Sequence, residues 1–471
     1  MLAVLFILCV LGLSYGLTLA PDLTWAHFSA DGGDLIAATA TGGVPHPSGY
    51  PLYLLLARPF QWLPVGTLAF RTNLFSAILT VLTALCLYGF LLRPLRGRPR
   101  ARFSAMLAAL AYGLAPFIWG QALVTEVYAL HGLMVMLALL TLSAENRPGI
   151  ECLRGLVFGL AATQHLTALL LFPLLCLNFQ QGLFVSGRVW LARCLGFLGG
   201  LSLYLLLPLR AAGAPPVNWG NPVSLEGFFW LVSGRLYSNY LFSLSFFEII
   251  QRFRGFAGLL LEQYTLPGVL LGLYGLFALP SRFLRLTTLW IAGVFLFFSV
   301  FYGSFDSQVN LLAVWLVFAI WLAFGLQDLF ELLQAYPRFQ TAGSVLLLAA
   351  LLLRLPVTFR AVDVSHDFRA RDFINQAFDN LPPQAIVFIE GDEQIFSLWY
   401  AQFGLQQRPD LVLVATGLLP QPWYRENLSK TYPGLNLPPG DQFQPAQLRA
   451  ANPGRVSCTL SAAGTVCQGV K

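Results

Sequence analysis

Long stretches without a charged side chain recur along the sequence. They cover residues 2–20, 72–92, 103–125, 127–144, 155–187, 194–209, 263–281, 286–305, 307–327 and 339–353. A bilayer core about 30 Å thick needs roughly 20 apolar helical residues, so each stretch predicts a membrane span. The stretch 155–187 would be roughly 50 Å long as a single helix, so it should break at its polar cluster, 163–167. The pattern predicts eleven transmembrane helices.

Arginines divide unevenly between the two sets of alternating connections. One set contains Arg93, Arg96, Arg98, Arg100, Arg102, Arg147, Arg154, Arg188, Arg193, Arg282, Arg285 and Arg338. The short connections of the other set, near 120–126, 163–167 and 303–310, contain no arginine. The positive-inside rule therefore predicts a multi-pass membrane protein with a cytoplasmic N-terminus and an extracytoplasmic C-terminus. Residues 2–20 could instead be a cleaved signal peptide, but a basic n-region is missing and Pro21 disfavours cleavage.

The predicted fold is a mainly α membrane protein, with a polytopic domain over 1–356 and an extracytoplasmic α/β domain over 357–471. Two large outer loops, 21–70 and 210–262, belong to the membrane domain. The second carries aromatic side chains and charges of both signs.

Within the C-terminal domain, two short apolar runs predict buried parallel strands at 385–389 and 411–415. Residues 367–380 and 393–404 predict helices, and the tail from about 436 is predicted to be irregular.

Composition agrees with a membrane protein, because 57% of the 471 residues are hydrophobic and 11% are charged. Soluble domains carry about 25% charged residues, so an ordinary water-soluble enzyme is excluded. The net charge of +6 is not gathered in a basic run that could follow a phosphate backbone, so no nucleic-acid partner is expected. Of the seven cysteines, only Cys458 and Cys467 lie in a polar tail at a spacing that would close a small loop, and an oxidising compartment would favour a disulfide there.

Ionisable side chains near the apolar stretches are few, and the predicted topology places them on one face. They are Asp31, Asp34, Glu126, His165 and Asp306. Each could simply be a solvated loop residue, but their convergence on the outer face favours a site.

Asp31 and Asp34, separated by two glycines, form the most informative pair. Asp34 could be the N-cap of a following helix, with Asp31 as a turn residue. Alternatively, the pair could supply a general base with a supporting acid, or hold a divalent cation. Next come the turn 46–51 and an amphipathic segment containing Arg58, which suits a helix in the membrane interface.

The stretches GGDLIAATATGGVPHPSGYPLYLLLARPF and RTNLFSAILTVLTALCLYGFLLR resemble the N-terminal signature of a bacterial multispan family of unassigned function. That family is related to the vertebrate transmembrane protein O-mannosyltransferase, and both are GT-C type membrane glycosyltransferases. Further similar stretches are WGQALVTEVYAL, TQHLTALLLFP, LPLRAAGAPPVNWGNP, SGRLY and DEQIFSLWYAQFGLQQRPD. The family usually has Asp-Ser-Gly-Glu-Leu where this chain has Asp31-Gly-Gly-Asp34-Leu.

The resemblance implies transfer of a sugar from a polyprenyl-phosphate donor to an extracytoplasmic hydroxyl of a protein, lipid or polysaccharide. Asp31 is then the first candidate for the base and Asp34 the second. Arg58 and Arg235 would stabilise the leaving phosphate, as could His46 and His165. The positions expected at the substrate are His46, Tyr50, Arg58, Glu126, His165, Asn218, Trp219 and Arg235.

Several of these residues could instead have structural roles. Arg58 and Trp219 could anchor the chain in the membrane interface, and Glu126 could form an ion pair. His165 could simply occupy the helix break, and Asp306 could belong to a loop turn. At the level of function, a transporter or flippase of lipid-linked sugars and a non-catalytic envelope scaffold are the alternatives. Transporters tend to have ionisable groups near mid-membrane and are often built from repeated halves. In this sequence the ionisable groups are predicted at one face, and no internal repeat is apparent, which disfavours a transporter. No cofactor is certain from the sequence, because it has no zinc-ligand spacing and no nucleotide-binding glycine loop.

Overall fold

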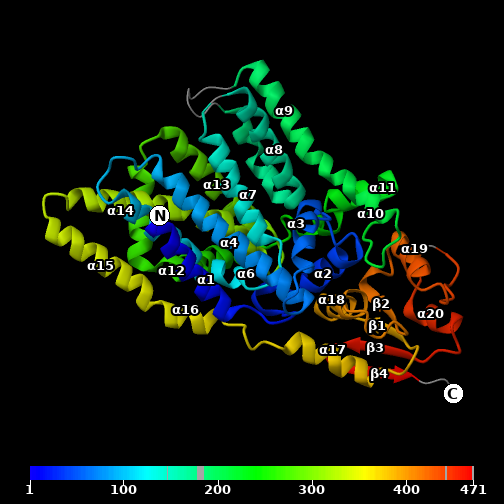
Figure 1. Ribbon diagram of the computed structural model, residues 1–471. Helices are drawn as coiled ribbons and strands as arrows, with labels where there is room; N and C mark the ends of the chain where they lie inside the picture. The colour runs from blue at the N-terminus through cyan, green and yellow to red at the C-terminus, as the bar shows by residue number, and fades with distance from the viewer. Residues whose placement is uncertain (146, 178–184, 441–442, 469–471) are drawn as a thin grey trace.

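The computed structural model describes residues 1–145, 147–177, 185–440 and 443–468. A body of long helices forms one part of the molecule, and a small sheet with its own helices lies at one end (Figure 1). Part of the predicted span 155–187 lies outside the described residues.

The helical body contains fifteen segments. They are α1 (Leu2–Thr18), α4 (Leu68–Leu92), α5 (Ala101–Gly113), α6 (Pro116–Ala122), α7 (Tyr128–Leu142), α8 (Pro148–Gln164), η2 (Leu166–Cys176), α9 (Gly187–Leu201), η3 (Ser202–Leu205), α10 (Leu206–Ala211), α12 (Phe246–Ala278), α13 (Arg282–Phe301), α14 (Leu312–Leu332), α15 (Pro337–Leu353) and α16 (Leu355–Val362).

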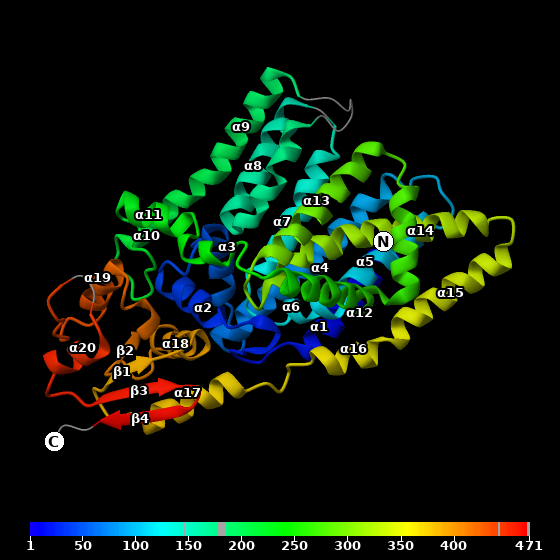
Figure 2. The same cartoon turned by 180° about the vertical axis from the view of Figure 1, so that it is seen from behind.

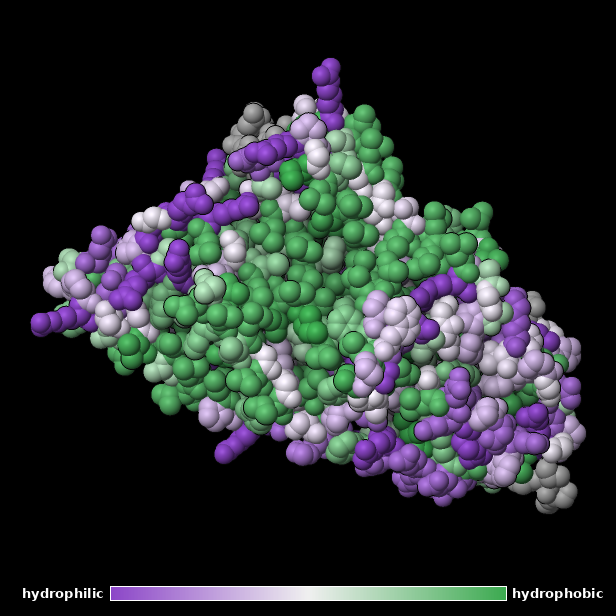
Figure 3. Space-filling view, in the orientation of Figure 1, coloured by the Kyte–Doolittle hydropathy of each residue, from purple (hydrophilic) through white to green (hydrophobic). Residues whose placement is uncertain are grey.

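Among the described residues, six helical segments are long and apolar enough to cross a membrane. The number is seven if α5 and α6, bent by 65°, form one span. The helices α1, α7 and η2 are apolar but shorter, so the count of eleven spans remains a prediction. Apolar side chains cover the middle of the body, and hydrophilic side chains gather at its upper left rim and over the sheet-containing end (Figure 3).

The predicted interruption of the stretch 155–187 is present. Helix α8 ends at Gln164, His165 is extended with φ −158°, and η2 begins at Leu166. A second interruption, in α12, occurs at Thr265 with φ 59°, two residues before Pro267.

The two predicted outer loops are largely helical. The first contains η1 (Ala26–Phe28), α2 (Gly32–Thr41) and α3 (Pro51–Gln61), and the second contains α11 (Leu225–Val232) and η4 (Arg235–Tyr240). The prediction that all of 210–262 is a loop was wrong, because α12 begins at Phe246. Ser245 and Glu248 form a capping box that starts this helix. Its first turns carry charged side chains, so the start of the helix is not part of a charge-free stretch of sequence.

The C-terminal part contains a four-stranded sheet of order β2-β1-β3-β4. Its elements are α17 (Arg369–Asn380), β1 (Ile386–Ile389), α18 (Asp392–Trp399), η6 (Tyr400–Gly404), β2 (Val412–Ala415), η7 (Thr416–Leu418), α19 (Pro422–Thr431), α20 (Pro445–Ala451), β3 (Ser457–Ser461) and β4 (Gly464–Gln468). The two strands predicted from apolar runs are β1 and β2, and they pair in parallel with Ile386 opposite Val412.

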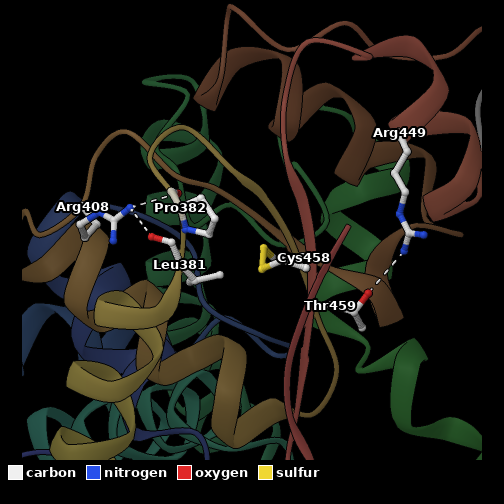
Figure 4. The surroundings of a disulfide bond; sticks show 7 residues. Leu381, Pro382, Arg408, Arg449, Cys458 and Thr459 are labelled. Atoms are coloured by element: carbon white, nitrogen blue, oxygen red, sulfur yellow. Dashed lines mark hydrogen bonds between the residues drawn. A yellow bond between two sulfur atoms is a disulfide. The ribbon is translucent and has the colours of Figure 1, made fainter. Parts of the chain in front are cut away.

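The prediction of an irregular tail was wrong. Strand β3 pairs in parallel with β1, and β4 returns antiparallel to β3. Cys458 and Cys467 face each other across this hairpin and form a disulfide of 2.02 Å. Arg449 reaches Thr459 on the same strand, and Arg408 donates to the carbonyls of Leu381 and Pro382 (Figure 4). These strands are short and polar, so their sequences lack the apolar signal that revealed β1 and β2.

The sheet-containing part packs on the first outer segment. A Cβ on Gly33 of α2 would lie 2.2 Å from the carbonyl oxygen of Phe396 in α18, so the two backbones touch. The Tyr400 hydroxyl donates to Asp22 at 2.8 Å, and the Trp25 indole donates to Ser397 at 3.0 Å. One hydrophobic core continues from α2 through the second outer segment into the sheet. Seen from behind, α18 lies beside α2 (Figure 2), so the C-terminal part reaches the Asp31–Asp34 segment. The domain boundary at residue 357 remains a prediction.

Candidate active site

Asp31 and Asp34 lie at the start of α2 but in different surroundings. Asp31 holds the N-cap position without a side-chain capping bond, and Asp34 is in the first turn. The prediction of Asp34 as N-cap was wrong, because the two glycines are helical instead of forming a turn before the helix. About a third of the Asp31 side chain is exposed, whereas Asp34 is fully buried.

Asp34 accepts three hydrogen bonds. Its Oδ2 receives the backbone N–H of His46 at 2.9 Å and lies 2.7 Å from the Nδ1 of the same residue. Its Oδ1 receives the indole N–H of Trp219 at 3.1 Å. Both oxygens of Asp34 therefore have protein partners, and this carboxylate orients the imidazole of His46.

His46 links the two carboxylates, because its Nε2 lies 3.5 Å from Oδ2 of Asp31. Burial alone would lower the pKa of His46. The charge of Asp31, the hydrogen bond that the imidazole donates to Asp34 and the charge of Asp34 outweigh burial and raise this pKa to about 9. The imidazole is therefore positively charged at neutral pH.

Asp31 has the chemistry expected of a general base. Burial raises its pKa to about 6, the charge of His46 opposes that rise, and Asp392, Asp34 and Asp306 add to it. A base whose pKa lies near the working pH is well matched to proton abstraction. Asp392 begins α18, so the C-terminal part contributes a charge to the site, and burial raises the pKa of its carboxyl as well.

The other predicted acids lie in the same neighbourhood. Glu126, between α6 and α7, interacts electrostatically with Asp31 and Asp306. Asp306 precedes η5 (Ser307–Leu311) and accepts a hydrogen bond from the hydroxyl of Ser304. The structural ion pair considered for Glu126 is absent from the described residues, where its Oε1 is buried without a partner.

An aromatic wall borders the acids. The ring centroid of Tyr50 lies 5.0 Å from that of His46 and 6.3 Å from that of His165. The ring of Tyr128 lies 5.7 Å from His165. Parts of the chain around residues 31–50, 126–128, 165 and 306, which are distant in the sequence, thus interact here. Their assignment to the outer face stays a prediction.

Four other predicted residues, Arg58, Trp219, Asn218 and Arg235, have different surroundings. Arg58 donates to the carbonyls of Thr39 and Ala40 at the C-terminal end of α2, so its guanidinium is directed at the helix end. Trp219 is 4% exposed and packs against Trp399 and Trp423. It is therefore unavailable for stacking on a sugar or for anchoring in the interface, and it supports Asp34 instead.

Asn218 and Arg235 differ in exposure. Asn218 is buried beside Trp219 and its Nδ2 donates to Asn221 at 3.2 Å, whereas Arg235 is exposed at the start of η4. Tyr237, two residues after Arg235, interacts electrostatically with Asp31. Arg235 is thus exposed, whereas the guanidinium of Arg58 is directed at the end of α2.

A divalent cation between Asp31 and Asp34 does not fit this arrangement. The charged imidazole of His46 lies between the two carboxylates, where a bridging cation would have to sit. Among the described residues, no group of three or more His, Cys, Asp or Glu side chains has a metal-binding arrangement.

Asp392 was not among the residues predicted for the site, although its position after a predicted strand could have indicated it. The residue follows directly after the carboxyl end of parallel strand β1, and ligand-binding residues of α/β sheets gather at such ends.

Two family models match the chain. Residues 31–181 match the TMEM260 protein O-mannosyl-transferase N-terminal domain, and residues 370–445 match the TMEM260-associated domain 2. The chain is 25% identical over 455 residues to the mouse protein O-mannosyl-transferase TMEM260, with 88% of this chain and 63% of the relative covered. It is 21% identical to the Dictyostelium discoideum relative of the same name, with 94% and 60% covered.

Solved structures agree at the level of fold. ArnT from Cupriavidus metallidurans, bound to undecaprenyl phosphate, aligns with TM-score 0.55 at 13% identity, covering 89% of this chain and 91% of ArnT. An Archaeoglobus fulgidus oligosaccharyltransferase aligns with TM-score 0.50 at 12% identity, covering 88% and 62%. The chain is thus similar to the TMEM260 protein O-mannosyl-transferases and shares the fold of ArnT and of the oligosaccharyltransferase. Its several long apolar helices indicate a multi-pass membrane protein.

The TMEM260-matched ranges contain both sides of the site. The first begins at Asp31 and includes His46, Glu126 and His165, and the second includes Asp392. The chain spans about 60% of the length of its TMEM260 relatives.

Proposed function

We propose that this chain is a glycosyltransferase that moves a sugar from a polyprenyl-phosphate donor to an extracytoplasmic hydroxyl. The observation that carries the proposal is the arrangement of Asp31, His46 and Asp34. Asp31 is a partly exposed carboxylate with a pKa near 6, and it lies beside the buried, hydrogen-bonded pair of His46 and Asp34. The names of the TMEM260 relatives support mannose as the sugar and protein Ser or Thr as the acceptor. ArnT bound to undecaprenyl phosphate supports a lipid-linked donor.

In the proposed reaction, Asp31 accepts the proton of the acceptor hydroxyl. The hydroxyl oxygen then forms a bond to the anomeric carbon, and the bond from that carbon to the phosphate oxygen breaks. The electron pair of the broken bond remains on the lipid phosphate. A base positioned in this way contributes about 10²–10⁴ in rate.

Charges around Asp31 fit this role. The imidazolium of His46 stabilises the Asp31 carboxylate before the reaction, and Asp34 holds the imidazole in place. Arg235 is exposed and lies two residues before Tyr237, which interacts electrostatically with Asp31. It is our candidate for stabilising the charge that develops on the leaving phosphate.

We further propose that the site faces the extracytoplasmic side of the plasma membrane, with the N-terminus in the cytoplasm. The uneven distribution of arginines supports this orientation. The disulfide between Cys458 and Cys467 supports an oxidising compartment for the C-terminal part.

Mass spectrometry of envelope glycans tests the function in cells. Cells lacking the chain should lose one glycan modification, and the wild-type chain should restore it while Asp31→Asn should not. Asp372→Asn, which changes an exposed carboxylate on α17, is the matched control and should restore it. Restoration by Asp31→Asn would contradict the assignment of the base, and unchanged glycans in cells lacking the chain would contradict the proposed function.

A further inference from the structure

The proposed proton transfer does not use a group of buried polar atoms close to the aromatic rings. The Oε1 of Glu126, both ring nitrogens of His131 and the Oε1 of Gln164 are buried, and within the described part of the chain they have no hydrogen-bond partner. Buried polar atoms are nearly always paired, so an unpaired group calls for an explanation, such as a ligand.

These atoms belong to one neighbourhood. The ring of His131 lies 5.1 Å from the ring of His165. Gln164 directly precedes His165, and its Nε2 donates to the carbonyl of Val127, next to Glu126, at 2.7 Å. Glu126 in turn interacts electrostatically with Asp31. The unpaired atoms therefore extend inward from the proposed base.

The chemistry of these atoms selects the kind of ligand. Burial raises the pKa of the Glu126 carboxyl, so this group can donate as well as accept, whereas an amide oxygen only accepts and a neutral imidazole offers one donor and one acceptor. Such a set contains no cation to neutralise a phosphate group, but it complements hydroxyl groups, which both donate and accept. The rings of Tyr50, Tyr128 and His165 add apolar faces on which the C–H groups of a sugar ring can lie.

We propose that Glu126, His131 and Gln164 form the subsite for the sugar ring of the lipid-linked donor, and that they determine which sugar is accepted. This inference rests on the proposed function. The rings of Tyr128 and His165 are half-buried, whereas Glu126, His131 and Gln164 are buried. The half-buried rings therefore form the accessible side of the proposed subsite. The phosphate remains outside the subsite.

A direct binding comparison tests the subsite without requiring turnover. The probes are a short-chain polyprenyl phosphate and the same lipid carrying a mannosyl group, titrated calorimetrically into the full chain in nanodiscs without acceptor. The wild type should bind the mannosylated lipid more tightly. Each lost hydrogen bond to a sugar hydroxyl should reduce that preference about tenfold.

His131→Phe is the principal variant, because it removes both unpaired nitrogens while preserving a ring of similar size. An apolar replacement of unpaired buried groups is close to neutral for stability. The melting temperature should therefore be maintained, while the preference for the mannosylated lipid falls about tenfold and affinity for the bare lipid phosphate is unchanged. Glu126→Gln, which converts the carboxylate to an amide of the same shape, should also lower the preference and provides the test if His131→Phe does not fold.

Thr287→Val is the matched control. It removes a buried hydroxyl that also lacks a hydrogen-bond partner within the described residues. Thr287 lies about two turns along α13 from Phe295, and the ring of Phe295 contacts that of His131. This variant should leave the preference unchanged. An unchanged preference in His131→Phe, or in Glu126→Gln if the former does not fold, would overturn the subsite. Absence of sugar transfer by the wild type, measured separately with acceptor present, would instead refute the proposed function.

Discussion

Replacing His46 by glutamine should shift the pH dependence of transfer. The substitution removes a positive charge 3.5 Å from Asp31 and leaves a side chain that can still donate to Asp34. Loss of the charge destabilises the Asp31 carboxylate, so the pKa of Asp31 should rise above its value of about 6.

The size of the shift follows from the distance. Two unit charges about 4 Å apart interact by about 1 kcal/mol in water and about 4 kcal/mol near a protein surface. About a third of the Asp31 side chain is exposed, so solvent screens the pair and the lower end of this range applies. Because one pKa unit corresponds to about 1.4 kcal/mol, the expected rise is about one unit.

The assay is the rate of sugar transfer as a function of pH at saturating donor. The acidic limb of the His46→Gln profile should move upward by about one pH unit. Activity lost at pH 6 to 7 should therefore be largely regained at pH 8 to 9. A merely structural role for His46 would lower the rate equally at all pH values. An acidic limb that does not move would refute the assignment of His46 as the residue that adjusts Asp31.

Three further variants test the packing around the site and the stability of the C-terminal part. Trp219→Phe removes a hydrogen bond to the buried carboxylate of Asp34, so it should lower the free energy of unfolding by roughly 1.5–3 kcal/mol, measured by chemical denaturation in detergent. Gly33→Ala should greatly reduce transfer, measured with purified protein, because the new methyl group would force α18 and Asp392 away from α2. Replacing Cys458 and Cys467 together by serine opens a loop with a sequence separation of 9. It should cost about 2–3 kcal/mol of stability, seen as a lower melting temperature of the C-terminal part.

Controls separate these effects from general damage. Gly12→Ala places a methyl group where no atom lies within 4 Å, so it should leave transfer intact. If Gly33→Ala behaves in the same way, the contact between α2 and α18 is not required for activity. If the double serine variant has the same melting temperature as the wild type, the disulfide contributes little to stability.

The sequence predicts those parts of the fold whose signals are local. The break at His165 follows from the one polar cluster in an otherwise apolar stretch, and strands β1 and β2 follow from short apolar runs. The start of α12 was missed because its first turns carry charges, so a search for uncharged stretches assigned them to a loop.

The acids near Asp31 were predictable, but Asp392 and the contacts between the residues were not. Asp31, Glu126 and Asp306 interact electrostatically, as their predicted convergence requires, and their assignment to the outer face stays a prediction. The role of Asp34 could not be predicted, because its partners His46 and Trp219 are 12 and 185 positions away. Such contacts depend on tertiary packing. For the same reason, Trp219 looked like an exposed aromatic although it is a buried hydrogen-bond donor.

Transfer in a purified system tests the central claim most directly. Wild-type protein in nanodiscs, given mannosyl phosphoryl polyprenol and a Ser/Thr-containing acceptor peptide, should release polyprenyl phosphate and glycosylated peptide in equal amounts. Asp31→Asn should remain folded, still bind the donor lipid and be slower by about 10²–10⁴. Equal rates for the wild type and Asp31→Asn would contradict the claim that Asp31 is the base.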